Sequence, residues 1–289
     1  MSISKACKFL GYSKQAYFKA RNNEEAKQLK TEFAEAFILE KIKEVRSNLP
    51  KLGGLKLYFL IKPFLVKESI QIGRDKFFEI LRAHNLLVKR KRRNYKTTDS
   101  SKWRKQFDNL VEGLLPSRPE QIWVADITYF ETMEEGAVYG HLITDAYSKK
   151  IMGFEVSIDM KASSTCKALK MALKNRQYKD ELIHHSDRGS QYCSGEYVRV
   201  LKRNKIQISM TQSGSPYDNA IAERINRILK EEFLLGKMYL NILEVKKLAT
   251  SAVGIYNNYR PHWSNYLLTP QQMHQQCEVK IKTWSKKKD

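Results

Sequence analysis

Cysteine is scarce in this sequence: four cysteines are spread over 289 residues, and no two of them form a C-x-x-C pair. This spacing argues against a zinc knuckle and a disulfide framework, and it favours a reducing compartment. Long apolar runs are lacking as well. The most hydrophobic stretch, residues 52–66, carries Lys56, Lys62 and Pro63, whereas a membrane helix needs ~20 apolar residues. The N-terminus also lacks the pattern of a secretory signal. We therefore expect a folded cytoplasmic protein that does not enter a membrane and holds no zinc.

Negative charge is in short supply too. The chain has 52 Lys and Arg against 31 Asp and Glu, which gives a net charge of +21. Its 42% hydrophobic and 11% aromatic content excludes a disordered basic tail. Most of the excess lies in residues 1–119, with a net charge of +15, against +6 in residues 120–289. A folded protein with so much positive charge favours nucleic acid as its partner.

The densest positive charge is the run Lys89, Arg90, Lys91, Arg92 and Arg93. Such a run can contact phosphates and release their counterions, although an isolated run is more often a solvated linker. Because this run follows two helical segments and precedes a stretch rich in Thr and Ser, we interpret it as a linker that tracks DNA.

Helical periodicity dominates the N-terminal part. Residues 1–22 predict two short helices, with Ser13 capping the second, and residues 24–48 predict a longer amphipathic helix. A further helix pair is expected over residues 55–67 and 74–85.

This later pair has the pattern of a helix-turn-helix. Its second helix begins with Arg74 and Lys76, which would place basic side chains at the DNA-facing end of a recognition helix. Because many small helical bundles look similar, the helix pattern alone is weak evidence. The positive charge of this part of the chain strengthens the interpretation as a helix-turn-helix.

From about residue 120 the pattern changes to short segments rich in β-branched and aromatic residues, with helices interspersed. The predicted strands are residues 122–130, 138–147, 151–158, 182–184 and 206–209. The predicted helices are residues 163–175, 196–203, 219–233 and 242–259. Three strands followed by alternating helices and strands predict an α/β fold, a mixed sheet with helices on its faces.

Three acidic residues are notable for their context. Asp126 interrupts an apolar strand, where an unpaired charge would be costly. Asp187 follows a strand directly, in a loop at the end of the sheet, and Glu223 lies on a helix. Each alone has an ordinary explanation as an edge charge, a turn former or an exposed helix residue. Together they offer the carboxylate oxygens that Mg²⁺ prefers.

The helix that carries Glu223 has two distinct faces. At 100° per residue, its isoleucines cluster on one side, and Glu223 and Lys230 lie on the other, flanked by Asn219, Asn226 and Arg227. A carboxylate beside amides and cations suits metal and phosphate better than packing. Simple surface ion pairs remain the alternative for the nearby arginines.

Three segments resemble the integrase-like DDE transposases of bacterial insertion sequences, above all the second-frame (OrfB) protein of the IS-three family. They are IWVADITYF at 122–130, HHSDRGSQY at 184–192 and SPYDNAIAERINRILKEEF at 215–233. Between Asp187 and Glu223 lie 35 residues, the spacing for which the family's motif is named, and Lys230 matches a basic residue two helical turns after the family's glutamate. The segment YNNYRPHWSNYLLTP and the helix-turn-helix region resemble further parts of the same family.

The resemblance implies an RNase H-like core with a mixed five-stranded sheet and flanking helices, preceded by an all-α helix-turn-helix region. It further implies that Asp126, Asp187 and Glu223 are the catalytic residues and hold two Mg²⁺ ions, with Mn²⁺ as an alternative metal. The implied reaction is cleavage and transfer of DNA strands at the ends of an insertion sequence. Asp145 is a rival carboxylate on the second strand, and we assign it a structural role.

The resemblance also implies double-stranded DNA as partner, a homo-oligomer on that DNA, and a bacterial, nucleoid-associated location. An upstream-frame product, or its frameshift fusion with this chain, is a further expected partner. The residues expected to contact DNA near the metals are Lys230, Arg227, Asn219, Arg188 and His185. For His185 and its neighbour His184, a hydrogen-bonded structural role is an equal alternative.

The chain is expected to divide into four parts. We predict a DNA-binding region at residues 1–96, a linker at 97–119, the catalytic core at 120–235, and a helical extension with a basic tail at 236–289. Two other functions stay open at this point, a DNA-binding protein with a decayed core and a general nuclease. An intact carboxylate triad argues against decay, and the helix-turn-helix segments argue for recognition of particular DNA ends.

Overall fold

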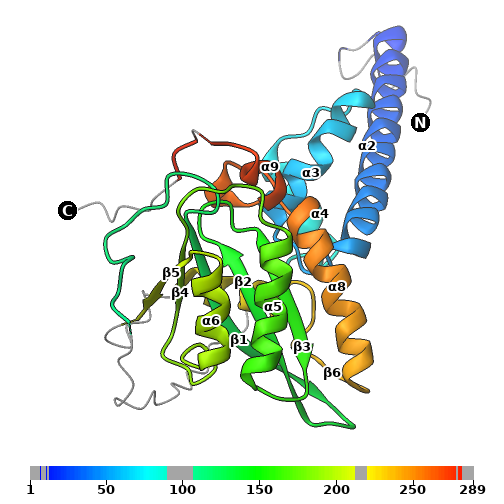
Figure 1. Cartoon of the computed structure of the whole chain (residues 1–289). Coiled ribbons are helices and arrows are strands. Elements are labelled where there is room, and N and C mark those ends of the chain that lie inside the picture. Colours follow the sequence, from blue (N-terminus) through cyan, green and yellow to red (C-terminus); the bar gives the residue numbers. More distant parts are fainter. Residues whose placement is uncertain are drawn as a thin grey trace, which may run out of the picture. The chain divides into compact units, whose positions relative to one another are not determined.

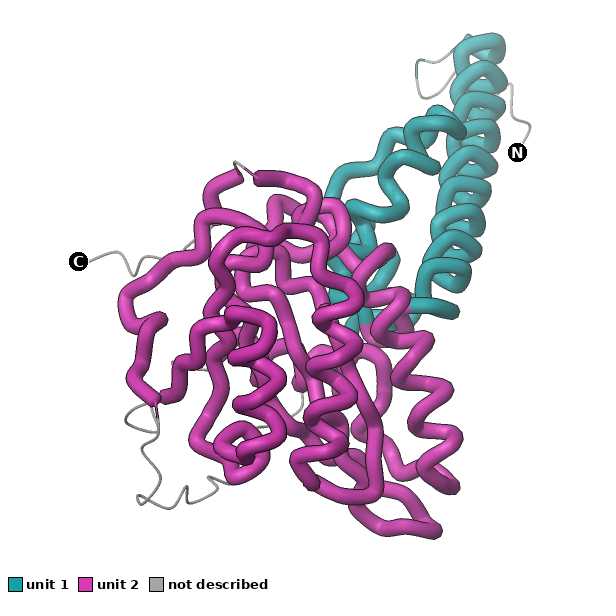
Figure 2. The backbone as a smooth tube through the Cα atoms, viewed as in Figure 1, with its two compact units in different colours: residues 1–48, 52–89 teal, residues 49–51, 90–289 magenta. Residues whose placement is uncertain are grey.

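The computed structural model describes residues 7, 11, 13–89, 107–211, 220–277 and 279–281. The chain forms two compact units, coloured separately in Figure 2, which comprise residues 1–48 with 52–89 and residues 49–51 with 90–289. Five of the predicted DNA-contact residues lie outside the described residues: Arg90, Lys91, Arg92, Arg93 and Asn219.

The first unit contains three long helices, α2 (Lys14–Asn48), α3 (Gly54–Lys67) and α4 (Arg74–Ala83). The predicted cap of α2 is confirmed, since the Ser13 hydroxyl accepts a hydrogen bond of 3.0 Å from the backbone N–H of Ala16. The predicted break between residues 22 and 24 is wrong. Because residues 14–48 contain no proline and no glycine, nothing in the backbone interrupts a single helix of 35 residues.

Apolar side chains from all three helices form the core of this unit. Ile38 and Ile42 of α2 are buried, as are Leu57 and Ile61 of α3 and Phe77 of α4. The two shorter helices lie close to the ranges 55–67 and 74–85 that the sequence predicted for them.

The second unit is built on a mixed sheet. Its strands are β1 (Ile122–Thr132), β2 (Ala137–Asp145), β3 (Ile151–Ser157), β4 (Ile183–Ser186), β5 (Gln207–Met210) and the short β6 (Met238–Tyr239). The five main strands lie in the order β3-β2-β1-β4-β5, with β1–β2 and β2–β3 antiparallel and β1–β4 and β4–β5 parallel. This arrangement confirms the RNase H-like mixed sheet, and β6 adds a short parallel partner for the end of β1.

Helices cover both faces of the sheet. On one face lie α5 (Ala162–Lys174) and α6 (Gly195–Arg203), which run side by side in front of the sheet in Figure 1. Their buried side chains form one hydrophobic core with Trp123 and Ala125 of β1. The helices α7 (Ala220–Glu231) and α8 (Ile242–Asn258) share a second core with Phe130 and other residues of the sheet. Because alternate residues of a strand face opposite sides, β1 contributes to both cores.

The approach of α5 to the sheet depends on Gly153 of β3. A Cβ atom built there would lie 2.1 Å from the backbone oxygen of Ala168, so any side chain at this position would push the helix away.

After α8 the chain forms the short helices η1 (Trp263–Asn265) and α9 (Pro270–His274), which the sequence did not predict. The Thr269 side chain caps α9 in a complete capping box with Gln272. In the part of the chain that the structure describes, no helix is long and apolar enough to span a lipid bilayer.

Candidate active site

Asp126 lies in β1 just beyond the point where β4 stops pairing with that strand, since β4 pairs only with Ile122 to Val124. One carboxylate oxygen of Asp126 accepts a 2.9 Å hydrogen bond from the backbone N–H of Ile127, and the other accepts a 2.7 Å bond from the Asn226 amide of α7. Asp126 is therefore fixed in position by its own strand and by the helix that carries Glu223.

Asp187 directly follows the carboxyl end of β4, where loops of α/β sheets gather functional groups. Its Oδ1 atom accepts a 2.9 Å hydrogen bond from the backbone N–H of Gly189, so the loop folds around the carboxylate. The neighbouring Arg188 donates from Nε to the backbone oxygen of Thr211 at 2.6 Å. Arg188 thus ties the Asp187 loop to the residue that follows β5.

Glu223 lies in the first turn of α7 and is exposed. The sequence placed Glu223 opposite the isoleucines of this helix, and Ile225 and Ile228 are indeed buried in the core. Negative charge near a helix N-terminus is also favoured by the helix dipole.

The three carboxylates influence one another electrostatically. Burial, the charge of Asp187 and, to a smaller extent, that of Glu223 raise the pKa of Asp126 to about 7, although the hydrogen bonds from Ile127 and Asn226 oppose this shift. Loss of surrounding water likewise raises the pKa of Asp187, against the hydrogen bond from Gly189. Burial is thus the largest cause of both shifts.

The donor atoms of this site fit a divalent metal ion. All three side chains offer carboxylate oxygens, and the nearby Oδ1 atom of Asn226 is buried without a hydrogen-bond partner among the described residues. Mg²⁺ prefers such oxygens and takes only one or two carboxylates along with substrate phosphate. In the described part of the chain no group of three His, Cys, Asp or Glu side chains is closed around a single point that could hold a metal. The side chains thus offer oxygen atoms suited to a divalent metal ion, but they do not surround a single point.

Lys230 of α7 lies near this site. Its ammonium group is 4.0 Å from the centre of the Tyr129 ring. Burial lowers the pKa of Lys230, and the nearby carboxylates of Asp126 and Glu131 offset only part of that effect. Arg227, one residue after Asn226, is partly exposed on the same helix.

The two histidines beside Asp187 are buried rather than presented to a ligand. His185 is 0% exposed, and its Nδ1 atom lies 2.9 Å from the Ser209 hydroxyl. His184 shares a 2.8 Å hydrogen bond with the Tyr197 hydroxyl, and burial, together with the charge of His185, lowers the pKa of His184 to about 3. Contrary to the expected DNA contact of His185, this burial favours the structural alternative for both residues.

In the first unit the predicted contacts Arg74 and Lys76 are exposed at the start of α4. Each also has an acidic neighbour, Asp75 at 3.0 Å from Arg74 and Glu79 at 2.9 Å from Lys76. Lys89, the first residue of the basic run and the last one described before residue 107, is exposed as well.

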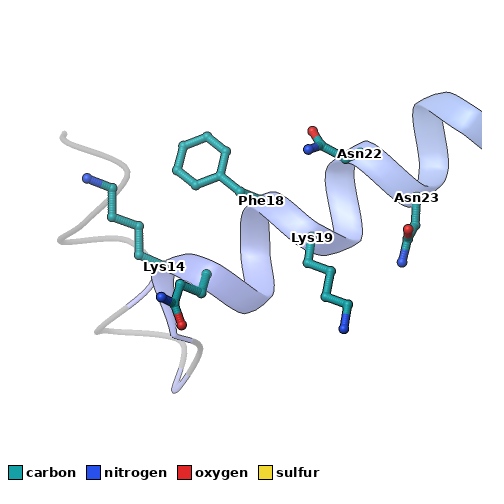
Figure 3. Close-up of a pocket in the computed structure, with 6 residues that line it drawn as sticks. Lys14, Phe18, Lys19, Asn22 and Asn23 are labelled. Carbon is teal, nitrogen blue, oxygen red and sulfur yellow. The ribbon is translucent and has the colours of Figure 1, made fainter.

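A depression beside the first turns of α2 has no part in this chemistry. Its lining comes from one helix alone, and the side chains fan out in several directions, as Figure 3 shows for Lys14, Phe18, Lys19, Asn22 and Asn23. A single helix of this kind encloses no ligand.

Asp145, the rival carboxylate, is fully buried at the end of β2. It accepts hydrogen bonds from the backbone N–H groups of Glu120 and Ser148 and from the Ser148 hydroxyl, at 2.6–2.8 Å. These contacts agree with the structural role assigned to it.

Two residues near the site were not assigned their roles from sequence. Asn226 holds Asp126 although 100 positions separate them, and only its place one turn after Glu223 gave a signal. Tyr129 is contacted by Lys230, and its position three residues after Asp126 was the only hint.

Together the strand order β3-β2-β1-β4-β5 and the helices on both faces define an RNase H-like core of the integrase class. Two models of the integrase core domain match this chain, over residues 116–216 and 204–270. The chain is 36% identical over 200 residues to the insertion element IS600 uncharacterized 31 kDa protein of Shigella sonnei, covering 68% of this chain and 73% of that protein. It is 36% identical over 167 residues to transposase InsF for insertion sequence IS3A of Escherichia coli K12, covering 57% of this chain and 58% of InsF.

Solved retroviral structures are more distant. The integrase catalytic core domain of HTLV-2 in complex with magnesium is 18% identical, with a TM-score of 0.44, and covers 54% of this chain and 97% of that one.

The chain belongs to the IS3 family of insertion-sequence transposases, a class of DDE polynucleotidyl transferases whose function is DNA transposition and integration. The match spans about three fifths to three quarters of the length of these relatives.

Proposed function

We propose that this chain cleaves DNA strands at the ends of its insertion sequence and joins them to target DNA, with Asp126, Asp187 and Glu223 as metal-binding catalytic residues. The observation that carries this proposal is a juxtaposition: the Asn226 amide of α7, three residues after Glu223, donates a 2.7 Å hydrogen bond to Asp126 of β1, and Asp187 follows β4, the parallel neighbour of β1. The charges of Asp187 and Glu223 both oppose the charged form of Asp126, and a divalent cation would favour it.

The proposed roles follow from the positions of the side chains. Asp126 and Asp187 would hold metal from β1 and from the loop after β4, and Glu223 would do so from α7. Two Mg²⁺ ions, or Mn²⁺ in their place, would supply activation of the attacking hydroxyl and neutralisation of the leaving oxygen. Asn226 keeps the Asp126 carboxylate oriented through its 2.7 Å hydrogen bond. Lys230 and Arg227 would hold phosphate beside the carboxylates.

The remaining partners belong to the same proposal. Double-stranded DNA would contact the helix-turn-helix at Arg74 and Lys76 and the basic run that starts at Lys89. Residues 1–96 would form the DNA-binding region, residues 97–119 the linker and residues 236–289 an extension of the core. We further propose that the chain acts as a homo-oligomer on DNA in the bacterial nucleoid, together with the upstream-frame product or its frameshift fusion.

A cleavage and joining assay tests this function. The full chain, alone and with the upstream-frame product, is incubated with Mg²⁺ or Mn²⁺ and a labelled duplex that contains an element end and its flanking DNA. We expect nicking at the element boundary and joined products, both lost in Asp187→Asn.

Glu181→Gln is the matched control, because Glu181 is an exposed acidic residue of the same unit, six positions before Asp187. Full activity of Asp187→Asn would contradict the catalytic assignment. Nicking without preference for the element end would indicate a general nuclease instead.

A further inference from the structure

One edge of β1 is open at the active site. Its other edge pairs with β2 along almost the whole strand, from Trp123 to Glu131. On the open side, β4 pairs only up to Val124 and β6 only from Glu131, so within the described part of the chain the six residues between have no strand beside them. Asp126 and Tyr129 both lie in this unpaired stretch. The backbone N–H of Ile127 there donates to Asp126 and not to a neighbouring strand.

Tyr129 presents a large aromatic surface at this opening. Its side chain is 56% exposed, whereas the adjacent Phe130 is 3% exposed and supplies the packing with α7 and α8. The fold therefore gains little from burying the Tyr129 ring, and the ring is left available for contact with a ligand.

The Lys230 ammonium group lies 4.0 Å from the centre of this ring, within the range of a cation–π contact. Burial of Lys230 removes water from the ammonium group, while Asp126 and Glu131 favour its charged form. Lys230 thus contacts the ring and also lies near enough to Asp126 to be affected by its charge.

These groups match the two halves of a nucleotide. An ammonium group binds phosphate, and an exposed aromatic ring offers a face on which any base can stack. The same pairing of a basic group with an aromatic platform recurs where proteins hold single-stranded nucleic acid.

We propose that Tyr129 is a positioning residue that stacks on an unpaired base next to the scissile phosphate, while Lys230 holds the phosphate of the same nucleotide. This inference rests on the proposed function, because it assumes a DNA end in the active site. Tyr129 would fix the direction in which the strand enters and so align the phosphate with Asp126.

A cycle of protein and substrate changes tests the stacking. Wild type, Tyr129→Val and Tyr129→Phe are assayed for cleavage with Mg²⁺ on element-end duplexes that are intact or carry an abasic nucleotide on either side of the scissile phosphate. Removing the ring or the base should each slow cleavage by roughly tenfold, in line with the scale of base–aromatic stacking. At one of the two abasic positions, Tyr129→Val acting on the abasic duplex should cleave no more slowly than Tyr129→Val on the intact duplex or wild type on the abasic duplex. Tyr129→Phe, which keeps the ring, should behave like wild type.

A binding measurement without chemistry accompanies the assay. With 2-aminopurine at the identified position and Ca²⁺ in place of Mg²⁺, wild type and Tyr129→Phe should quench its fluorescence, and Tyr129→Val should not. Tyr259→Val serves as a control, because Tyr259 is 67% exposed in the same unit but lies far along the chain from the carboxylates.

Losses that multiply at both positions, or equal quenching by Tyr129→Val, would overturn the stacking inference and leave the proposed function standing. If wild type and Tyr129→Phe both fail to cleave intact element ends, alone and with the upstream-frame product, the proposed function is wrong, and the quenching measurement still decides whether Tyr129 contacts the base.

Discussion

Two groups of acidic side chains lie in the second unit, and the fold surrounds them very differently. Glu120 and Asp145 are fully buried, and both accept hydrogen bonds from backbone N–H groups. The imidazole of His274 lies between them, with Nε2 at 3.2 Å from Glu120 and Nδ1 at 3.6 Å from Asp145. Burial lowers the pKa of His274, but its hydrogen bonds with Asp145 and Glu120 outweigh that effect and raise it.

In the active-site group, the nearby cation Lys230 lies against the Tyr129 ring. Asp126 accepts hydrogen bonds from Ile127 and Asn226, yet its pKa rises to about 7 because burial and Asp187 oppose the charged form. The comparison teaches that His274 lies between the two buried carboxylates Glu120 and Asp145, whereas burial and the charge of Asp187 leave Asp126 with a raised pKa. Functional sites often retain such unfavourable interactions, because the rest of the fold supplies the stability.

The largest effect is expected when the same carboxyl-to-amide change is made once in each group. Asp126→Asn should slow strand cleavage by about a thousandfold or more, the scale of one lost charge-stabilising group in phosphoryl transfer. Asp145→Asn should leave the rate per folded molecule nearly unchanged. The measurement is cleavage of labelled end DNA, normalised by the folded fraction from tryptophan fluorescence. All four tryptophans belong to the second unit. Equal losses of specific activity would remove the distinction between the two groups.

The next effect concerns stability. His274→Ala should lower the free energy of unfolding of the second unit by about 3 kcal/mol, because Glu120 and Asp145 lose a shared donor in a buried site. Urea unfolding followed by tryptophan fluorescence measures this change. Lys161→Ala is the control, since Lys161 forms an exposed ion pair of 3.3 Å with Asp159 and should matter by less than ~1 kcal/mol. Equal effects of the two substitutions would show that the buried group adds nothing to the fold.

The sequence predicted what depends on local signals. Strands rich in β-branched residues and helices with clear periodicity were found within a few residues, as for α5, predicted at 163–175 and observed at Ala162–Lys174. Asp126 could be singled out as a candidate site residue because a charge inside an apolar strand is unusual. Glu223 could be singled out because its helix has one apolar and one polar face.

Features that depend on distant contacts could not be predicted. His274 meets Glu120 across 154 positions, and nothing in the short segment around α9 indicates that contact. The strand β6 has two residues and exists only because the chain after α7 passes the end of β1. The burial of His185 likewise depends on Ser209 of a neighbouring strand, so sequence left its role open.

The smallest effect tests the active-site group without any reaction. The pKa of Asp126 in the folded protein is about 7, against an ordinary value of 3.8. As the pH rises from about 4 to 7, the unfolded chain therefore releases this proton first, and the stability of the metal-free protein falls. Asp126→Asn removes this loss, so in EDTA it should stabilise the second unit by about 2 kcal/mol more at pH 8 than at pH 5. Urea unfolding at the two pH values measures the difference.

Asp180→Asn, at a carboxylate that is 63% exposed, should show no such dependence. Mg²⁺ at pH 8 should stabilise wild type but not Asp126→Asn. If the effect of Asp126→Asn is the same at both pH values, the pKa of Asp126 is not raised in the folded protein, and this electrostatic argument for a cation fails.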